Sequence, residues 1–298
     1  MYRLFPYNPR MATTTPFTLP TPAATLDGLV DLPDPQRHPG PRPAVVICHG
    51  FKGFMEWGFF PHLGTLLAER GFVAVRFNLS GSGMRPGGDR VDDPEAFRAN
   101  THSREVEDLL AILAATAATG TAIAPGRVDT SRIGLLGHSR GGGDALLASA
   151  REPWRDRLRA LVTWAAVADF DRYSSEQKDA WRRDGAFPVV NARTGQQLAL
   201  GRGLLEDLEA HRAELDLAAA AAHRRAPWLI IHGERDESVP AAEGERLADV
   251  SKRATAPAEL LLIPGADHTF GSRHPFVGPT PGLIQALNAT QGWFRKHL

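Results

Sequence analysis

The chain has 298 residues, of which 43% are hydrophobic, and its 34 basic residues balance its 34 acidic residues. Its single cysteine excludes an internal disulfide and a cysteine-based metal cluster. A net charge of zero argues against nucleic acid or an anionic membrane as the main partner, because both attract clustered positive charge. Only four of the basic residues are lysine, and we interpret the many arginines as scattered, solvated charge.

The ends of the chain and its apolar runs predict neither export nor membrane insertion. No run approaches the ~20 apolar residues of a membrane span, and the first 15 residues lack the apolar core of a secretory signal. We therefore expect a cytoplasmic protein, either a monomer or a homodimer, with Met11 as an alternative start. Residues 1–16 are predicted to form an N-terminal tail and residues 17–298 one domain.

Short, continuously apolar runs alternate with helical patterns along the chain. A strand that is covered on both faces has such a composition, as in a parallel sheet. Residues 17–32 are expected to add one or two antiparallel edge strands. The sequence thus predicts an α/β fold with a mostly parallel, doubly wound sheet. The predicted core strands are 44–48, 72–77, 133–136, 160–167, 228–231 and 259–263.

Helices are predicted between these strands. Val106, Leu109, Leu110 and Leu113 follow the spacing of a helix face, with Glu105 in the first turn, where the helix dipole favours anions. Further helical patterns cover residues 142–150, 240–250 and 283–294.

The stretch from residue 169 to residue 226 is much longer than the crossover of about a dozen residues that a parallel sheet requires. Its last part is predicted to be the crossover helix, with Asp216 as N-cap. We interpret the remainder, about 169–215, as a cap or lid insertion that follows the strand at 160–167. The alternative is a surface excursion without a role in binding.

The motif Gly137-His138-Ser139-Arg140-Gly141 directly follows a predicted strand and precedes a predicted helix. In this context G-x-S-x-G forms a sharp turn that holds the serine hydroxyl clear of the sheet. Larger side chains at residues 137 and 141 would collide with neighbouring backbone. We therefore predict Ser139 as a catalytic nucleophile rather than as an inert serine in a tight turn.

A serine hydroxyl becomes a good nucleophile when a base accepts its proton and a third group orients that base. On this kind of fold the acid and then the base follow the serine in the chain. Asp236 follows the predicted strand 228–231, and His268 follows the strand 259–263. Because ligands bind at the carboxyl ends of parallel strands, we predict Ser139, Asp236 and His268 as the catalytic residues.

Other residues compete for these roles. The alternatives for the acid are Asp169, Glu234 and Asp267, and the alternatives for the base are His232 and His274. His138 is expected to pack and to form hydrogen bonds locally.

The tetrahedral intermediate needs hydrogen-bond donors for its oxyanion, and fixed backbone N–H groups suit this role. We predict the N–H groups of Arg140 and Phe51, with Gly50 allowing the close approach of the backbone. Lys52 is expected to be solvated.

Phe51, Phe54, Trp57 and, from the insertion, Trp181 are predicted substrate-pocket residues. Packing beneath the cap is the alternative for these side chains.

Other chemistries lack their motifs. The sequence contains neither H-E-x-x-H nor C-x-x-C, so we expect no metal. A phosphate-binding P-loop is absent, and Gly81-Ser82-Gly83 does not begin a complete G-x-G-x-x-G, so we expect no nucleotide cofactor and no other cofactor. Cys48 is expected to be buried and inert.

Taken together, these residues resemble the α/β-hydrolase superfamily over about residues 25–298. The His-Gly loop at residues 49–50 and the G-H-S-R-G-G motif are similar to the bacterial esterase and dienelactone-hydrolase-like branch, which includes prolyl-oligopeptidase-type catalytic domains. The resemblance implies a triad of Ser139, Asp236 and His268 and a cap formed by the insertion. Dienelactone hydrolases carry cysteine where this chain has Ser139, and prolyl-oligopeptidase-type enzymes carry an N-terminal propeller.

The sequence therefore predicts a cofactor-independent serine hydrolase that acts on small carboxylic esters, with a carboxylesterase as the expected class. Amides, small peptides and thioesters are alternative substrates, and a perhydrolase is an alternative activity, because the same triad serves all of them. A catalytically inactive hydrolase fold that acts as a binding protein is the alternative from another functional class.

Overall fold

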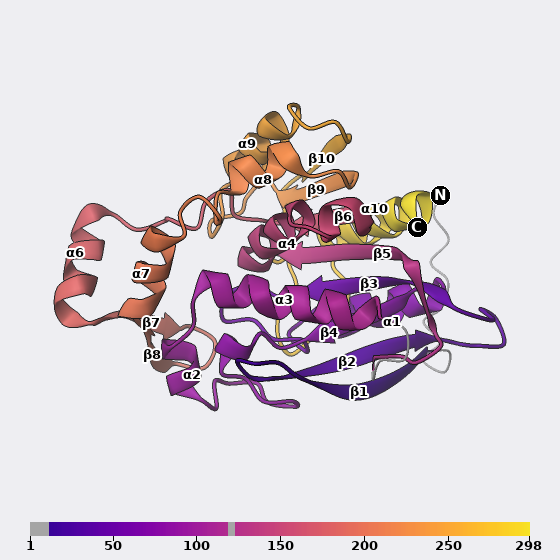
Figure 1. Cartoon of the computed structure of the whole chain (residues 1–298), viewed down its shortest axis with the longest axis horizontal. Coiled ribbons are helices and arrows are strands. Elements are labelled where there is room, and N and C mark those ends of the chain that lie inside the picture. The colour runs from indigo at the N-terminus through magenta and orange to yellow at the C-terminus, as the bar shows by residue number, and fades with distance from the viewer. Residues whose placement is uncertain (1–11, 119–122) are drawn as a thin grey trace.

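A twisted sheet of eight strands runs through the centre of the protein (Figure 1). The computed structural model describes residues 12–118 and 123–298. The strand order in the sheet is β1-β2-β4-β3-β5-β6-β9-β10. The strands from β4 to β10 in this order are parallel, whereas β2 pairs antiparallel with β1 and with β4. This arrangement confirms the predicted fold class and the antiparallel edge.

The sheet strands are β1 (Ala12–Pro20), β2 (Thr25–Pro33), β3 (Arg42–Cys48), β4 (Val73–Phe77), β5 (Val128–His138), β6 (Leu158–Trp164), β9 (Trp228–Gly233) and β10 (Ala258–Ile263), and β7 (Ala186–Asn191) and β8 (Gln196–Gly201) form a separate hairpin. The helices are α1 (Phe60–Glu69), α2 (Pro94–Arg98), α3 (His102–Thr116), α4 (Arg140–Ala150), α5 (Trp154–Arg157), α6 (Ser175–Asp184), α7 (Arg202–Ala210), α8 (Leu217–His223), α9 (Ala241–Ser251) and α10 (Pro281–His297), with a 3-10 turn, η1, at Ser80–Ser82.

The predicted N-terminal tail is too long at its C-terminal end. Residues 12–16 belong to β1, where Ala12 lies opposite Pro33 of β2. This edge strand buries only Phe17, so its threonine-rich sequence shows no apolar pattern that would mark a strand. Residues 1–11, including the alternative start Met11, lie outside the described residues.

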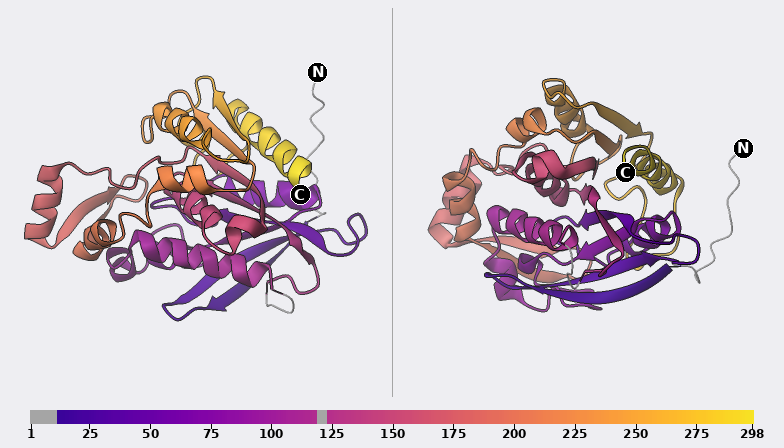
Figure 2. Two further views of the ribbon diagram at one scale, coloured as in Figure 1. Left: turned by 45° about the horizontal axis from the view of Figure 1, so that its top comes forward. Right: turned by 45° about the vertical axis from the view of Figure 1, so that its right-hand side comes forward.

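Helices cover both faces of the sheet (Figure 2). Helices α1 and α10 contribute Phe60, Leu63, Leu287 and Phe294 to one apolar cluster. Helices α3, α4, α8 and α9 contribute to the cluster on the opposite face. Alternate residues of β3 divide between the two clusters, which explains why its sequence is continuously apolar.

The predicted crossover helix begins where expected. Asp216 is the N-cap of α8, and its carboxylate accepts a hydrogen bond from the N–H of Ala219 at 2.9 Å. Because a side-chain acceptor satisfies one free N–H group at the start of a helix, the cap residue is readable from the sequence.

The chain between β6 and β9 and before α8, called the insertion below, contains α6, β7, β8 and α7. It extends from the side of the sheet at which β5 ends (Figure 1). Its apolar residues form a separate cluster with residues of the loop before α2 and of α2 itself. The cluster consists of Val91, Phe97, Trp181, Leu198, Leu200, Leu204 and Leu205.

Strands β7 and β8 of the insertion form an antiparallel hairpin, which was not predicted from the sequence.

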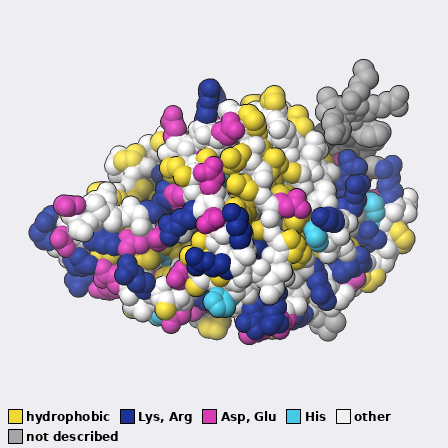
Figure 3. Space-filling model, turned by 90° about the horizontal axis from the view of Figure 1, so that it is seen from above, with side chains coloured by type: hydrophobic (Ala, Val, Ile, Leu, Met, Phe, Trp, Pro, Cys, Tyr) yellow, Lys and Arg dark blue, Asp and Glu magenta, His cyan; other side chains and the backbone are white. Residues whose placement is uncertain are grey.

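Basic and acidic side chains intersperse on the face drawn in Figure 3, and they crowd the end that carries the insertion. Arg182 pairs there with Asp179 and with Glu209, and Arg202 pairs with Glu206. Within residues 12–118 and 123–298, no helix combines the length and the apolar character that crossing a bilayer requires.

A buried ion pair joins the antiparallel edge to the parallel part of the sheet. Arg76 of β4 donates to both carboxylate oxygens of Asp31 of β2, at 2.8 and 3.1 Å, and also to the carbonyl oxygen of Met55 at 2.8 Å. Thr14 donates to Asp31 as well. Since both charged side chains are almost completely buried, each needs the other to compensate its lost hydration.

Replacing Asp31 by leucine leaves the Arg76 guanidinium buried without its carboxylate. We expect this variant to lose about 3–5 kcal/mol of the free energy of unfolding, measured by urea denaturation. The double variant Asp31→Leu, Arg76→Leu should recover much of the loss, because it removes both charges. Asp249→Ala, which breaks the exposed pair with Lys252, is the control and should change stability far less. A single variant as stable as the wild type would contradict the argument.

Candidate active site

The turn between β5 and α4 holds Ser139 in a backbone conformation that L-residues rarely adopt. Its φ and ψ are 58° and −124°, and it is the N-cap of α4. A Cβ on Gly137 would lie 2.1 Å from the carbonyl oxygen of Gly141, and a Cβ on Gly141 would lie 2.2 Å from that of His49. Both positions therefore require glycine, as the motif predicts.

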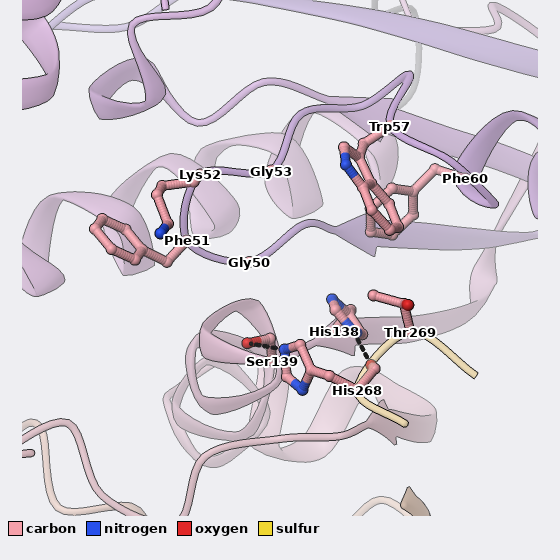
Figure 4. A pocket seen from close by; sticks show the side chains of 10 residues that line it. All are labelled: Gly50, Phe51, Lys52, Gly53, Trp57, Phe60, His138, Ser139, His268 and Thr269. Carbon is pink, nitrogen blue, oxygen red and sulfur yellow. Dashed lines mark hydrogen bonds between the residues drawn. The ribbon is translucent and has the colours of Figure 1, made fainter. Parts of the chain in front are cut away.

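Hydrogen bonds connect Ser139 to His268 and His268 to Asp236. Figure 4 shows the side chains of Ser139 and His268 and the hydrogen bond between them. The Oγ of Ser139 lies 3.0 Å from Nε2 of His268. The Nδ1 of His268 lies 2.7 Å from Oδ2 of Asp236. With the imidazole proton on Nδ1, Nε2 is free to accept the proton of the serine hydroxyl.

Asp236 is built to remain ionised. Burial acts to raise the pKa of its carboxyl, but hydrogen bonds from His232 and His268 outweigh burial and hold that pKa well below its usual range. The other carboxylate oxygen accepts the N–H groups of Ser238 and Val239, at 2.9 and 2.8 Å. A negative charge is thus available behind His268 across the range in which proteins are stable.

The alternatives for the acid and the base occupy other positions. Each of the described groups has a local role or lies exposed, and none of them joins Ser139 to a second titratable group. Asp169 and Asp267 accept backbone N–H groups of their own loops, Glu234 is exposed, His232 donates to the carbonyl oxygen of Val239, and Nδ1 of His274 accepts the N–H of Gly58.

His138 forms a hydrogen bond to the backbone of His268, in agreement with its expected local role. Its Nε2 donates to the carbonyl oxygen of His268 at 3.0 Å. Burial and the neighbouring His268 lower the pKa of His138 to about 3, so its ring stays neutral. A neutral ring beside His268 does not oppose the positive charge that the base gains during a reaction.

The loop after β3 lies against the serine turn. A Cβ on Gly50 would lie 2.8 Å from Cβ of Ser139 and 3.3 Å from the backbone nitrogen of Arg140. Among the described residues, the N–H groups of Phe51 and Arg140 have no hydrogen-bond acceptor. Two free donors beside a serine hydroxyl are the expected arrangement for an oxyanion hole.

His49 braces this loop, a role that sequence reasoning missed. Its Nδ1 donates to the carbonyl oxygen of Gly50 at 2.9 Å, and its Nε2 accepts the N–H of Leu79 at 3.2 Å. Burial lowers the pKa of His49 to about 4, which keeps the ring in the neutral form that both bonds require. In the sequence, only the position of His49 directly before Gly50 could have indicated this role.

The side chain of Arg140 packs against Phe51, the other residue with a free N–H group. Its guanidinium lies 4.2 Å from the centre of the Phe51 ring and donates to Glu105 at 2.6 Å. Burial acts to raise the pKa of Glu105, but Arg140 and His102 outweigh it and lower that pKa to about 2. Glu105 lies in the first turn of α3, as expected, and is in addition a buried counter-ion of Arg140.

A pocket of about 140 Å³ opens beside the serine. Trp57 lines it as predicted, together with Phe51. The predictions of Phe54 and Trp181 as lining residues are wrong for this pocket. Phe54 is buried beneath His274 and Arg193, and Trp181 is buried in the cluster of the insertion. The lining residues are Gly50, Phe51, Lys52, Gly53, Trp57, Phe60, His138, Ser139, His268 and Thr269 (Figure 4).

Metal-ligating side chains do not cluster in the described part of the chain, where no three His, Cys, Asp or Glu residues are arranged to hold an ion. Cys48 is buried, and burial raises the pKa of its thiol well above the usual value, which keeps it in the unreactive form.

Two of the buried histidines, His49 and His138, make stability depend on pH. Their folded-state pKa values of about 4 for His49 and about 3 for His138 lie below the ordinary 6.5. As the pH falls below 6.5, the unfolded chain binds protons that the folded chain does not, so the free energy of unfolding decreases. Each histidine contributes a slope of about 1.4 kcal/mol per pH unit.

We expect His138→Gln to reduce the slope of unfolding free energy against pH by about that amount. The measurement is urea denaturation of both proteins from neutral pH to mildly acidic pH. Equal slopes for the variant and the wild type would contradict a neutral, buried His138.

Comparisons with known proteins bear on the family and the fold of this chain. The model of the prolyl oligopeptidase family matches residues 57–298. The chain is 25% identical over 259 residues to the uncharacterized peptidase YuxL of Bacillus subtilis, covering 86% of this chain and 35% of that protein. It is 26% identical over 291 residues to a monoacylglycerol lipase of Mycolicibacterium smegmatis, covering 87% of this chain and 90% of that protein.

A solved structure of dienelactone hydrolase from Anabaena variabilis resembles this fold, with a TM-score of 0.62 and 17% sequence identity. The likeness covers 97% of this chain and 100% of that chain. The sheet order, the serine turn and the family match together confirm the resemblance to the α/β-hydrolases, and the chain belongs to the prolyl oligopeptidase family.

Proposed function

We propose that this hydrolase cleaves small carboxylic esters through an acyl-enzyme formed on Ser139. The observation that carries the proposal is the position of His268, whose two ring nitrogens lie 3.0 Å from the serine oxygen and 2.7 Å from Asp236. A base held between a hydroxyl and an ionised carboxylate is the arrangement that activates a serine.

The residues act in a defined order. The Oγ of Ser139 attacks the acyl carbon while Nε2 of His268 accepts its proton. Asp236 holds the imidazole tautomer and stabilises the imidazolium. The N–H groups of Phe51 and Arg140 donate to the oxyanion. His268 then protonates the departing alcohol, and water repeats the sequence on the acyl-enzyme.

The pocket favours an ester over a peptide as substrate. Its volume of about 140 Å³ is small beside the roughly 300–1,000 Å³ of typical ligand sites. Its described lining contains no Asp or Glu that would pair with the ammonium of a peptide N-terminus. Amides and thioesters remain the second candidates, because the same triad attacks their acyl carbons and the family match includes peptidases.

Ser139→Ala removes the nucleophile and little else, since the serine hydroxyl makes one side-chain hydrogen bond, to His268. We expect kcat on p-nitrophenyl butyrate to fall by about 10³-fold or more while the variant unfolds at an unchanged urea concentration. A fluorophosphonate should label the wild type and not the variant. Wild-type turnover retained by the variant would contradict the proposal.

The small pocket predicts a preference for short acyl chains. We expect kcat/KM for p-nitrophenyl acetate or butyrate to exceed that for the octanoate by about tenfold or more, because a long acyl chain does not fit into a pocket of about 140 Å³. The measurement is a series of acyl lengths with the wild type, corrected for hydrolysis by Ser139→Ala. A maximum at the octanoate would contradict the assigned acyl pocket.

A further inference from the structure

The described lining of the pocket contains one lysine and no Arg, Asp or Glu side chain. Lys52 lies in the loop after β3 and lines the pocket together with Ser139 and His268. Figure 4 shows Phe51 and Lys52 at one end of the pocket and Trp57 and Phe60 at the other, with Ser139 and His268 on the facing wall. The pocket therefore has a cationic end and an aromatic end.

The charge of Lys52 has no acidic partner among the described residues. Its ammonium donates to the carbonyl oxygen of Val190, at the insertion, at 3.2 Å, and no described carboxylate lies within ion-pair distance. The neighbouring cation, Arg140, is already paired with Glu105. Burial, and then Arg140, lower the pKa of Lys52, and no carboxylate opposes them. An anion entering the pocket would meet an uncompensated positive charge.

The backbone at Lys52 adds an independent argument. Its φ is 57°, in the left-handed region that glycine adopts without strain and that lysine adopts at a cost. Stability alone favours glycine at this position. A lysine nevertheless occupies this position, next to Phe51 and in the lining of the pocket.

We propose that Lys52 selects esters that carry a carboxylate. In the bound ester, this carboxylate lies in the pocket beside Ser139, within reach of the Lys52 ammonium. This inference rests on the proposed function. The ammonium has two hydrogens beyond the one given to Val190, and hydrogen bonds between ionised groups are stronger than neutral ones. The apolar part of such a substrate packs against Trp57 and Phe60 at the other end.

The test compares two pairs of esters that differ in one charge. The first pair is 4-acetoxybenzoate and its methyl ester, which place the charge on the leaving group. The second pair is p-nitrophenyl hydrogen adipate and p-nitrophenyl methyl adipate, which place it on the acyl group. The measured quantity is the ratio of kcat/KM for the anionic ester to that for the neutral ester, in which general effects on the triad cancel.

We expect the wild type to prefer the anionic ester in at least one pair, and Lys52→Met to lower that ratio about tenfold. Lys52→Arg should retain the preference, because it retains the charge. Lys252→Met removes the same charge from an exposed site, the C-cap of α9, and serves as the matched control, with an unchanged ratio.

The outcomes separate this inference from the proposed function. Equal ratios in Lys52→Met and the wild type overturn the role of Lys52, while hydrolysis that depends on Ser139 upholds the proposed function. Equal losses on both members of a pair also overturn the inference and instead assign Lys52 to holding the insertion through Val190. No Ser139-dependent hydrolysis of any of the four esters, with no fluorophosphonate labelling, overturns both.

Discussion

The close contact between two backbone turns determines how the rest of the site is arranged. The loop after β3 touches the β5–α4 turn at Gly50, and a Cβ on Gly141 would collide with the carbonyl oxygen of His49. Because these backbones meet without intervening side chains, the N–H groups of Phe51 and Arg140 lie beside the serine. Adding a methyl group at any of these glycines would separate the donors from the nucleophile before it affected the sheet.

The titratable side chains around this contact are either paired with another group or kept neutral by burial. Asp236 is ionised behind His268, whereas His49 and His138 remain neutral because burial lowers their pKa values. On the other side of the turn, Arg140 and Glu105 compensate each other. Burial, and next the charge of Glu105, raise the pKa of Asp144, whose carboxyl has no described hydrogen-bond partner. Apart from Asp236, the buried groups beneath the turns are therefore neutral or paired, whereas the charge of Lys52 in the pocket wall has no described acidic partner.

The sequence was sufficient for the features that depend on local pattern. Continuous apolar runs predicted the parallel strands, and glycines at 137 and 141 predicted the sharp turn, because backbone crowding leaves a direct trace in residue type. The order of Ser139, Asp236 and His268 followed from where strands end. These are consequences of chain geometry over a few residues.

The features that the sequence did not predict depend on contacts between distant residues. Glu105 and Arg140 are 35 positions apart, and Asp31 and Arg76 are 45 apart, so no local pattern indicates either pair. Phe54 and Trp57 are three positions apart in one loop, and only the tertiary fold decides which faces the pocket. The hairpin β7–β8 contains Pro188 and exposed positions, which obscure the alternation of a strand.

The insertion is coupled to the reacting atoms through the loop after β3. The ring of Phe51 stacks on Phe97 at 5.6 Å and packs against the cluster that contains Trp181. The same Phe51 lines the pocket together with Ser139, and Lys52 next to it donates to the carbonyl oxygen of Val190. A shift of the insertion would therefore move an oxyanion donor and the charged end of the pocket together. Sequence changes in the insertion are consequently expected to alter both substrate choice and turnover, even where they do not touch the substrate.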